Sequence, residues 1–211
     1  MAKGYFFKTP WWMRKLYPQR IWKIPVKEKT IYLSFDDGPH PVATPFVLDT
    51  LKKYNAKACF FCIGKNVEAE PAIYQRILAE GHSVGNHTQH HLNGWATKNS
   101  IYVKDVQMAA QNIESFLFRP PYGKLRNRQA KMLRKAFSEK KLKIIMWDVL
   151  SGDFDTAVSA QKCGEALRKN AIPGSIIVFH DSEKAWQKLQ IVLPAFLEEF
   201  SKRGFLFKAI T

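Results

Sequence analysis

The sequence contains few cysteines, no long hydrophobic run and no linker rich in glycine and serine. Its three cysteines, Cys59, Cys62 and Cys163, are an odd number and give no disulfide framework. Cys59 and Cys62 lie in an apolar segment typical of a buried strand, where their side chains would point to opposite faces. We therefore expect these thiols to fill the core, and we predict neither a disulfide nor a zinc site from the CxxC pattern.

No uninterrupted apolar segment approaches the ~18 residues that a membrane-spanning helix requires. The first 25 residues also lack the apolar stretch and the small-residue cleavage site of a classical signal peptide, because Lys3, Lys8, Arg14 and Lys15 interrupt them. By default, the sequence predicts a cytoplasmic protein or one at the membrane periphery.

The first 29 residues form a segment in which aromatic and basic residues are interleaved, and we call residues 1–29 the N-terminal arm. The part from Phe6 to Trp22 suits two situations. It can pack on the surface of the remaining domain, which we expect to span residues 30–211, or it can rest on an anionic membrane, where amphipathic aromatic rings and basic side chains are favoured. The sequence leaves both alternatives open.

Acidic residues are also scarce, since 18 Asp and Glu face 33 Lys and Arg and give a net charge of +15. Such a charge favours contact with anionic polymers or surfaces without naming a partner. No basic helix or recognised nucleic-acid-binding motif accompanies it, so we predict no specific nucleic-acid partner. With 211 residues, 46% of them hydrophobic, the chain can bury one large core. The oligomeric state stays open.

From residue 30 onward, strand-like and helix-like segments alternate. The apolar strand candidates are residues 30–35, 56–64, 82–86, 141–149 and 174–180. The segments with helical spacing are residues 44–55, 70–81, 100–116, 159–170 and 184–200. Repeated βα order predicts a largely parallel sheet that is buried on both faces, either an open doubly wound sheet or a barrel.

Polar residues stand at or just past the carboxyl end of most predicted strands. They are Asp36 and Asp37, His87, either Asp148 or Asp153, and His180. In parallel α/β folds these strand ends share one face, where active sites gather. The pattern therefore predicts a single polar site.

The segment "HTQHH" places His87 and His91 four residues apart, so that two imidazoles could bind one metal ion. Two histidines and one carboxylate are a catalytic zinc arrangement that leaves one position open for water. Asp36 or Asp37 of "SFDDGPH" could supply that carboxylate, and its neighbour would then accept a proton from the water that the metal activates. Arg119 in "FRPPYG" could keep the adjacent carboxylate ionised and oriented.

Five segments, in this order, resemble the motifs of the polysaccharide deacetylase family, also described as carbohydrate esterase family 4 or the nodulation-protein-type deacetylases. They are "SFDDGP", "HTQHH", "RPPYG", "WDVLSGDF" and "IIVFHD", and the resemblance covers roughly residues 30–210. It implies an irregular (β/α)7 barrel with parallel strands. It also implies a hydrolase that removes N-acetyl groups from amino sugars of a glycan with a divalent metal, usually zinc, with cobalt, nickel or manganese as alternatives.

The resemblance also implies a role for each motif residue. Asp36 corresponds to the general base that Arg119 orients, and the residues Asp37, His87 and His91 correspond to the metal ligands.

The remaining roles fall on the later motifs. His180 corresponds to the general acid whose ring Asp153 holds, and the backbone N–H of Tyr122 corresponds to an oxyanion donor. The resemblance further implies that four residues form the walls of the substrate groove, namely Pro121, Tyr122, Trp147 and Phe154.

Three positions depart from the family pattern. Leu150 stands where relatives often carry an acidic residue, Phe154 where many carry Trp, and Val178 where Leu is usual. We expect these changes to affect which substrate is bound rather than which reaction is catalysed. On the same fold, a deformylase of a lipid-linked sugar, an amidase of small amides and a catalytically silent glycan-binding module remain alternatives. We expect His82 and His90 to be structural rather than metal ligands.

Overall fold

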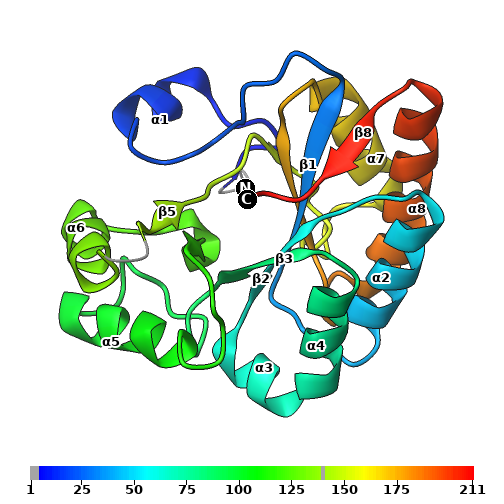
Figure 1. Cartoon of the computed structure of the whole chain (residues 1–211). Helices are drawn as coiled ribbons and strands as arrows, with labels where there is room; N and C mark the ends of the chain where they lie inside the picture. Colours follow the sequence, from blue (N-terminus) through cyan, green and yellow to red (C-terminus); the bar gives the residue numbers. More distant parts are fainter. Residues whose placement is uncertain (1–4, 139–140) are drawn as a thin grey trace.

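The computed structural model describes residues 5–138 and 141–211 and shows the predicted alternation of strands and helices (Figure 1). The strands are β1 (Thr30–Asp36), β2 (Cys59–Cys62), β3 (Ser83–Asn86), β4 (Leu117–Phe118), β5 (Lys143–Ile144), β6 (Val149–Leu150), β7 (Ile176–His180) and β8 (Leu206–Lys208). The helices are α1 (Trp11–Leu16), α2 (Ala43–Lys53), α3 (Gly64–Ala69), α4 (Pro71–Ala79), α5 (Asn99–Ala109), the short 3₁₀ helix η1 (Pro121–Gly123), α6 (Asn127–Ala136), α7 (Ala160–Asn170) and α8 (Trp186–Lys202).

The strands form one curved sheet in the order β5-β4-β3-β2-β1-β7-β6, with β8 paired to the first half of β1. Every ladder between these strands is parallel. The helices lie around the outside of the sheet, as Figure 1 shows for α2, α7 and α8 on one side and α5 and α6 on the other. The predicted irregular (β/α)7 barrel with parallel strands is therefore confirmed.

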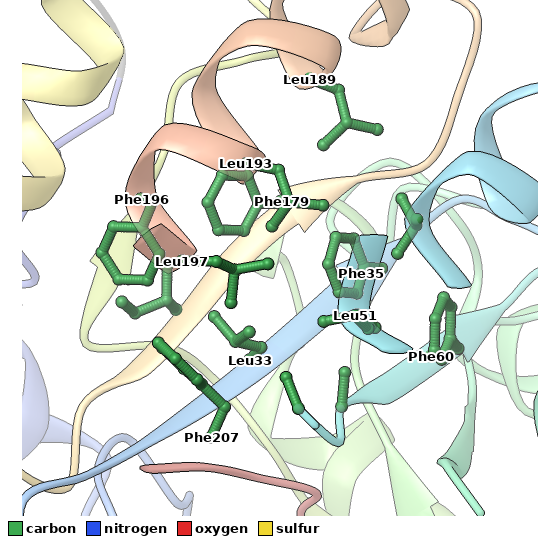
Figure 2. Packing of buried hydrophobic residues seen from close by; sticks show 14 of the residues in the cluster. Leu33, Phe35, Leu51, Phe60, Phe179, Leu189, Leu193, Phe196, Leu197 and Phe207 are labelled. Atoms are coloured by element: carbon green, nitrogen blue, oxygen red, sulfur yellow. The ribbon is translucent and has the colours of Figure 1, made fainter. Parts of the chain in front are cut away.

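The central strand β1 is anchored by aromatic packing. The ring of Phe35 stacks on those of Phe60 and Phe179, with centroids 5.1 and 5.8 Å away. Leucine and phenylalanine side chains of α8 cover this layer from outside (Figure 2). Burying each such side chain contributes about 1.5–3 kcal/mol, so the strand that ends at Asp36 is held rigidly.

The segment from residue 141 to 149, predicted as one strand, is instead divided between β5 and β6. The carbonyl oxygens of Ile145 and Met146, which lie between the two strands, accept hydrogen bonds from the Arg119 guanidinium at 3.3 and 3.0 Å. The backbone bends there because a buried side chain, rather than a neighbouring strand, satisfies these carbonyls.

The helices also differ from the predictions. The predicted helix 100–116 ends at Ala109 in the structure, and α1, α3 and α6 were not predicted. Only Gln129, Ala130 and Leu133 of α6 are buried, and basic residues fill much of the rest of the helix. The apolar residues of α6 recur at helical spacing, but the helix is basic overall and lacks the apolar content by which the other helices were predicted.

Residues 5–29 of the N-terminal arm run along the sheet beside β5 and β6, and residues 1–4 lie outside the described part of the chain. Lys8 forms an antiparallel bridge with Val149, and Ile21 forms a parallel bridge with Ile145. The Nζ of Lys8 lies 2.7 Å from the buried carboxylate of Asp148, and the guanidinium of Arg14 contacts the same carboxylate. The backbone of the arm thus packs on the barrel, while the division of the chain at residue 30 stays a prediction. Within the described residues, no helix is both long and apolar enough to cross a bilayer.

Replacing Asp148 with alanine is expected to lower the free energy of unfolding by about 3–5 kcal/mol. Lys8, Arg14 and Ser175 would lose their shared buried acceptor, whose Oδ2 lies 2.6 Å from the Ser175 hydroxyl. Urea denaturation measures the change. Asp49→Ala is the matched control, because Asp49 pairs with Arg76 at an exposed site, where a pair contributes about 0–1 kcal/mol. Equal losses in both variants would contradict the structural role of Asp148.

Candidate active site

Two adjacent carboxylates end β1 and face different partners. Asp36 is the last residue of the strand, whereas Asp37 adopts a left-handed backbone conformation with φ of 83°. The Oδ1 of Asp36 accepts a hydrogen bond from Arg119 at 2.6 Å. The Oδ1 of Asp37 lies 3.1 Å from Nε2 of His91 and 3.7 Å from Nε2 of His87. The change of backbone conformation separates the two side chains, and Asp37 is the one that joins the histidines.

Asp37, His87 and His91 form a group whose potential ligand atoms all lie within 4.8 Å of one another. The Nδ1 of His87 is 2.8 Å from the carbonyl oxygen of Arg119, to which it donates, and Nδ1 of His91 is 3.1 Å from the hydroxyl of Tyr122. Both rings therefore present Nε2 to Asp37. Second partners of this kind fix the orientation of metal-binding histidines, so the three residues fit a divalent cation.

The electrostatics of this group suit metal binding. Burial lowers the pKa of His87 to about 4, so its ring is neutral at pH 7. Burial alone would raise the pKa of Asp37, but the hydrogen bond from His91 and the charges of the nearby histidines hold it well below its usual range. A nitrogen or oxygen atom that binds a metal must be deprotonated. His87 and Asp37 already meet this condition at neutral pH.

Arg119 follows β4 and is completely buried. Its guanidinium donates to the hydroxyl of Ser34 at 2.8 Å as well as to Asp36, and its central carbon lies 4.0 Å from the ring centroid of Phe61. Several hydrogen bonds and an aromatic face thus fix the guanidinium, which in turn fixes the Asp36 carboxylate. The other carboxylate oxygen, Oδ2, is 4.0 Å from Nε2 of His87 and borders the group of potential ligands.

His180 ends β7, directly beside Asp36 in the neighbouring strand. The buried carboxylate of Asp153 accepts a hydrogen bond from the backbone N–H of His180 at 2.8 Å, and its other oxygen lies 2.8 Å from Nδ1 of the ring. Burial lowers the pKa of His180, but the charge and the hydrogen bond of Asp153 outweigh it and raise the pKa to about 9. His180 therefore carries a proton at neutral pH. Of the two aspartates left open by the sequence, Asp153 is the one that contacts His180.

Two of the four expected groove residues lie beside the site histidines. The ring of Tyr122, which has a φ of 59°, is 4.6 Å from that of His91, and the ring of Phe154 is 4.9 Å from that of His180. Tyr122 is 60% exposed, so it can meet a ligand.

The other two expected groove residues are more enclosed. Pro121 is buried, and Trp147 packs so closely on Gly123 that a larger residue there would clash. Gly123 has a φ of 68°, a conformation that also favours glycine. These two residues contribute to the support of the loop that carries Tyr122.

Sequence reasoning missed two further residues. Trp95 is 55% exposed, and the Nζ of Lys124 lies 5.6 Å from its ring centroid and 6.0 Å from that of Tyr122. Asp181 is buried and accepts hydrogen bonds from the N–H of Gly38 at 3.1 Å and from the hydroxyl of Thr44 at 2.5 Å. It thereby fixes the turn that follows Asp37. The motif "IIVFHD" includes Asp181 but did not indicate what this residue does. No motif in the sequence pointed to Trp95.

The remaining histidines of this region face other groups, as expected. The Nδ1 of His82 accepts a hydrogen bond from the N–H of Ala58 at 3.2 Å, and burial lowers the pKa of His82 to about 4. The Nδ1 of His90 is 2.6 Å from the Asp105 carboxylate. Neither belongs to the group of potential metal ligands.

The fold is a parallel α/β barrel. Its carboxyl edge carries a potential metal site and two oriented groups for proton transfer, an arrangement typical of hydrolases. Comparison with known proteins agrees with this class. The sequence pattern of the family described as polysaccharide deacetylase matches residues 23–139. The chain belongs to the polysaccharide deacetylase family, and the predicted class of enzyme, a carbohydrate N-deacetylase, is confirmed at the level of the family.

Individual relatives cover most of the chain. A peptidoglycan-N-acetylglucosamine deacetylase of Bacillus cereus is 32% identical over 196 residues, which are 90% of each chain. A chitooligosaccharide deacetylase of Azorhizobium caulinodans is 32% identical over 166 residues, 75% of this chain and 77% of the relative. A solved peptidoglycan N-acetylglucosamine deacetylase, in complex with 4-naphthalen-1-yl-N-oxidanyl-benzamide, superposes with a TM-score of 0.82 at 29% identity, covering 96% of this chain and 95% of that one.

Proposed function

We propose that this protein removes N-acetyl groups from the amino sugars of a glycan that resembles peptidoglycan or chitooligosaccharide. The observation that carries the proposal is the site itself. The potential metal ligands Asp37, His87 and His91 adjoin a carboxylate held by Arg119 and an imidazole held by Asp153. Hydrolysis of an amide needs a proton acceptor for water and a proton donor for the leaving amine, and the site supplies one of each.

A divalent cation held by Asp37, His87 and His91 would act as a Lewis acid that polarises the acetamide carbonyl and lowers the pKa of water. Two imidazoles and one carboxylate favour zinc, and cobalt, nickel or manganese are compatible with the same donors.

The chain's own residues complete the reaction. Asp36 accepts a proton from the attacking water, and Arg119 keeps its carboxylate in place. The backbone N–H of Tyr122 donates to the developing oxyanion, an interaction whose loss typically costs about 10²- to 10³-fold in rate. As the carbon–nitrogen bond breaks, His180 gives its proton to the nitrogen of the sugar, and acetate leaves.

The sugar rings would lie across the carboxyl edge of the barrel. Tyr122 and Phe154 flank the site histidines and offer aromatic faces, while Pro121 and Trp147 contribute to the groove from beneath. Exposed Trp95 would extend this surface beyond Tyr122.

The test is release of acetate from purified chitooligosaccharides and from peptidoglycan fragments, with an inactive Asp37→Asn variant as the background control. Acetate release supports the proposal. Release of formate from a formylated lipid-linked sugar without acetate release would favour the deformylase alternative. Binding of glycan without release of any acid, in a metal-loaded protein, would identify a silent binding module.

Removing the metal with a chelator is expected to abolish acetate release, and adding zinc should restore it. The chelated protein should also unfold at a lower temperature, because a ligand that binds only the folded state stabilises it. Asp37→Asn should show little change in unfolding temperature on chelation, since it lacks the charged ligand. Full activity after metal content falls to background, measured by elemental analysis, would contradict the proposed role of the cation.

A further inference from the structure

Helix α1 of the N-terminal arm presents large apolar side chains to solvent. None of its residues is buried, and Trp11, Trp12 and Leu16 are 68%, 48% and 62% exposed. The exposure of two adjacent tryptophan side chains to water is energetically unfavourable. Contiguous exposed apolar side chains are typical of interaction sites. We call Trp11, Trp12, Lys15 and Leu16 the α1 patch.

The α1 patch is held in place by contacts on both sides of the helix. Before it, the N–H of Thr9 donates to the carbonyl of Asp148 at 2.9 Å; after it, the N–H of Ile21 donates to the carbonyl of Ile144 at 2.9 Å. Within the helix, Arg14 points inward to the Asp148 carboxylate. The exposed side chains therefore project from a fixed base, which lowers the entropy lost when they contact a partner.

Positive charge surrounds this patch. Residues 5–29 contain seven Lys or Arg and a single acidic residue, Glu28. The Nζ of Lys15 lies 4.9 Å from the ring centroid of Trp11. Near the base of α1, a hollow of about 550 Å³ is lined by Arg14, Arg20, Lys23 and Lys143, and none of the described residues that line it is Asp or Glu.

From these observations we propose that the α1 patch and the adjoining basic hollow dock on an anionic membrane surface. Trp and Leu side chains partition into the interfacial layer, where Lys and Arg stay at the level of the phosphates. An anionic bilayer matches both the apolar side chains and the excess of positive charge, whereas a second copy of this chain would bring like charges to the contact. The packing of the arm on the barrel and its contact with a membrane are thus compatible.

The test is flotation of the full chain with vesicles of phosphatidylglycerol and phosphatidylcholine, compared with vesicles of phosphatidylcholine alone. Binding is expected only with the anionic vesicles and should weaken as salt is added. Trp11→Ser/Trp12→Ser should lower the partition coefficient at least ~10-fold, because two apolar side chains no longer enter the interface. Lys15→Gln should lower it about 5-fold, which corresponds to about 1 kcal/mol per charge.

Ile172→Ser/Ile191→Ser is the matched control, because these side chains are 44% and 62% exposed and lie outside the arm. The control should bind as the unaltered chain does, and all variants should keep the same unfolding temperature within a few degrees. Absence of flotation at low salt, or equal binding by the tryptophan variant, would overturn the proposal. So would a dimer that forms without vesicles and disappears in the tryptophan variant, since a second copy would then occupy the patch.

Discussion

Asp36→Asn is expected to lower turnover by at least ~10²-fold while the protein keeps its metal. An amide cannot accept the proton of the attacking water, but it retains most of the size of the carboxylate and can still accept a hydrogen bond from Arg119. Metal content and turnover are measured on the same purified sample, and turnover is expressed per folded molecule, because Arg119 loses a buried charged partner.

Asp37→Asn is the matched control for this experiment, since it makes the same chemical change one residue along. It should lower metal affinity and activity together. Asparagine is preferred to alanine at this position because it tolerates the left-handed conformation, in which Asp37 has a φ of 83°. A metal-loaded Asp36→Asn protein with nearly full activity would end the mechanism proposed for Asp36.

His180→Ala and Asp153→Asn should each lower turnover, by about 10²- to 10⁴-fold for the loss of the general acid, with full metal content. Their effects should not multiply in the double variant, because the two residues act as one unit. Multiplicative losses would show that Asp153 acts independently of the histidine.

The pH profile provides a second measure of this pair. Activity should fall as the pH rises through the pKa of His180, about 9, because the acid then loses its proton. Asp153 raises that pKa, so Asp153→Asn should move the alkaline limb to lower pH. Asp155→Asn is the control, since its carboxylate accepts a hydrogen bond from the hydroxyl of Tyr5. An unmoved limb in Asp153→Asn would exclude His180 as the group that titrates.

The strand ends could be predicted from the sequence because their signals are local. "IYLSF" before Asp36 and "SIIVF" before His180 are short apolar runs that stop at a polar residue, and parallel strands bring such ends together. The spacing of His87 and His91 likewise depends on a few consecutive residues.

Other features depend on contacts between distant residues and had no local signal. The break between β5 and β6 requires the carbonyls of Ile145 and Met146 to meet Arg119, which lies 26 residues before Ile145. The attachment of Lys8 to Asp148 spans 140 residues. Trp95 comes near Tyr122 only through the path of two loops, so the sequence could not reveal that both flank Lys124.

The buried cysteines make this protein convenient for spectroscopic labelling. Cys59, Cys62 and Cys163 have no exposed surface, and burial raises the pKa of Cys59 to about 12 and that of Cys62 well above its usual value. Thiol reagents attack the thiolate, so these side chains should stay unmodified in the folded state. A cysteine introduced at exposed Leu16 could then carry an environment-sensitive fluorophore, without removal of any native thiol, and report directly on the polarity that the helix encounters.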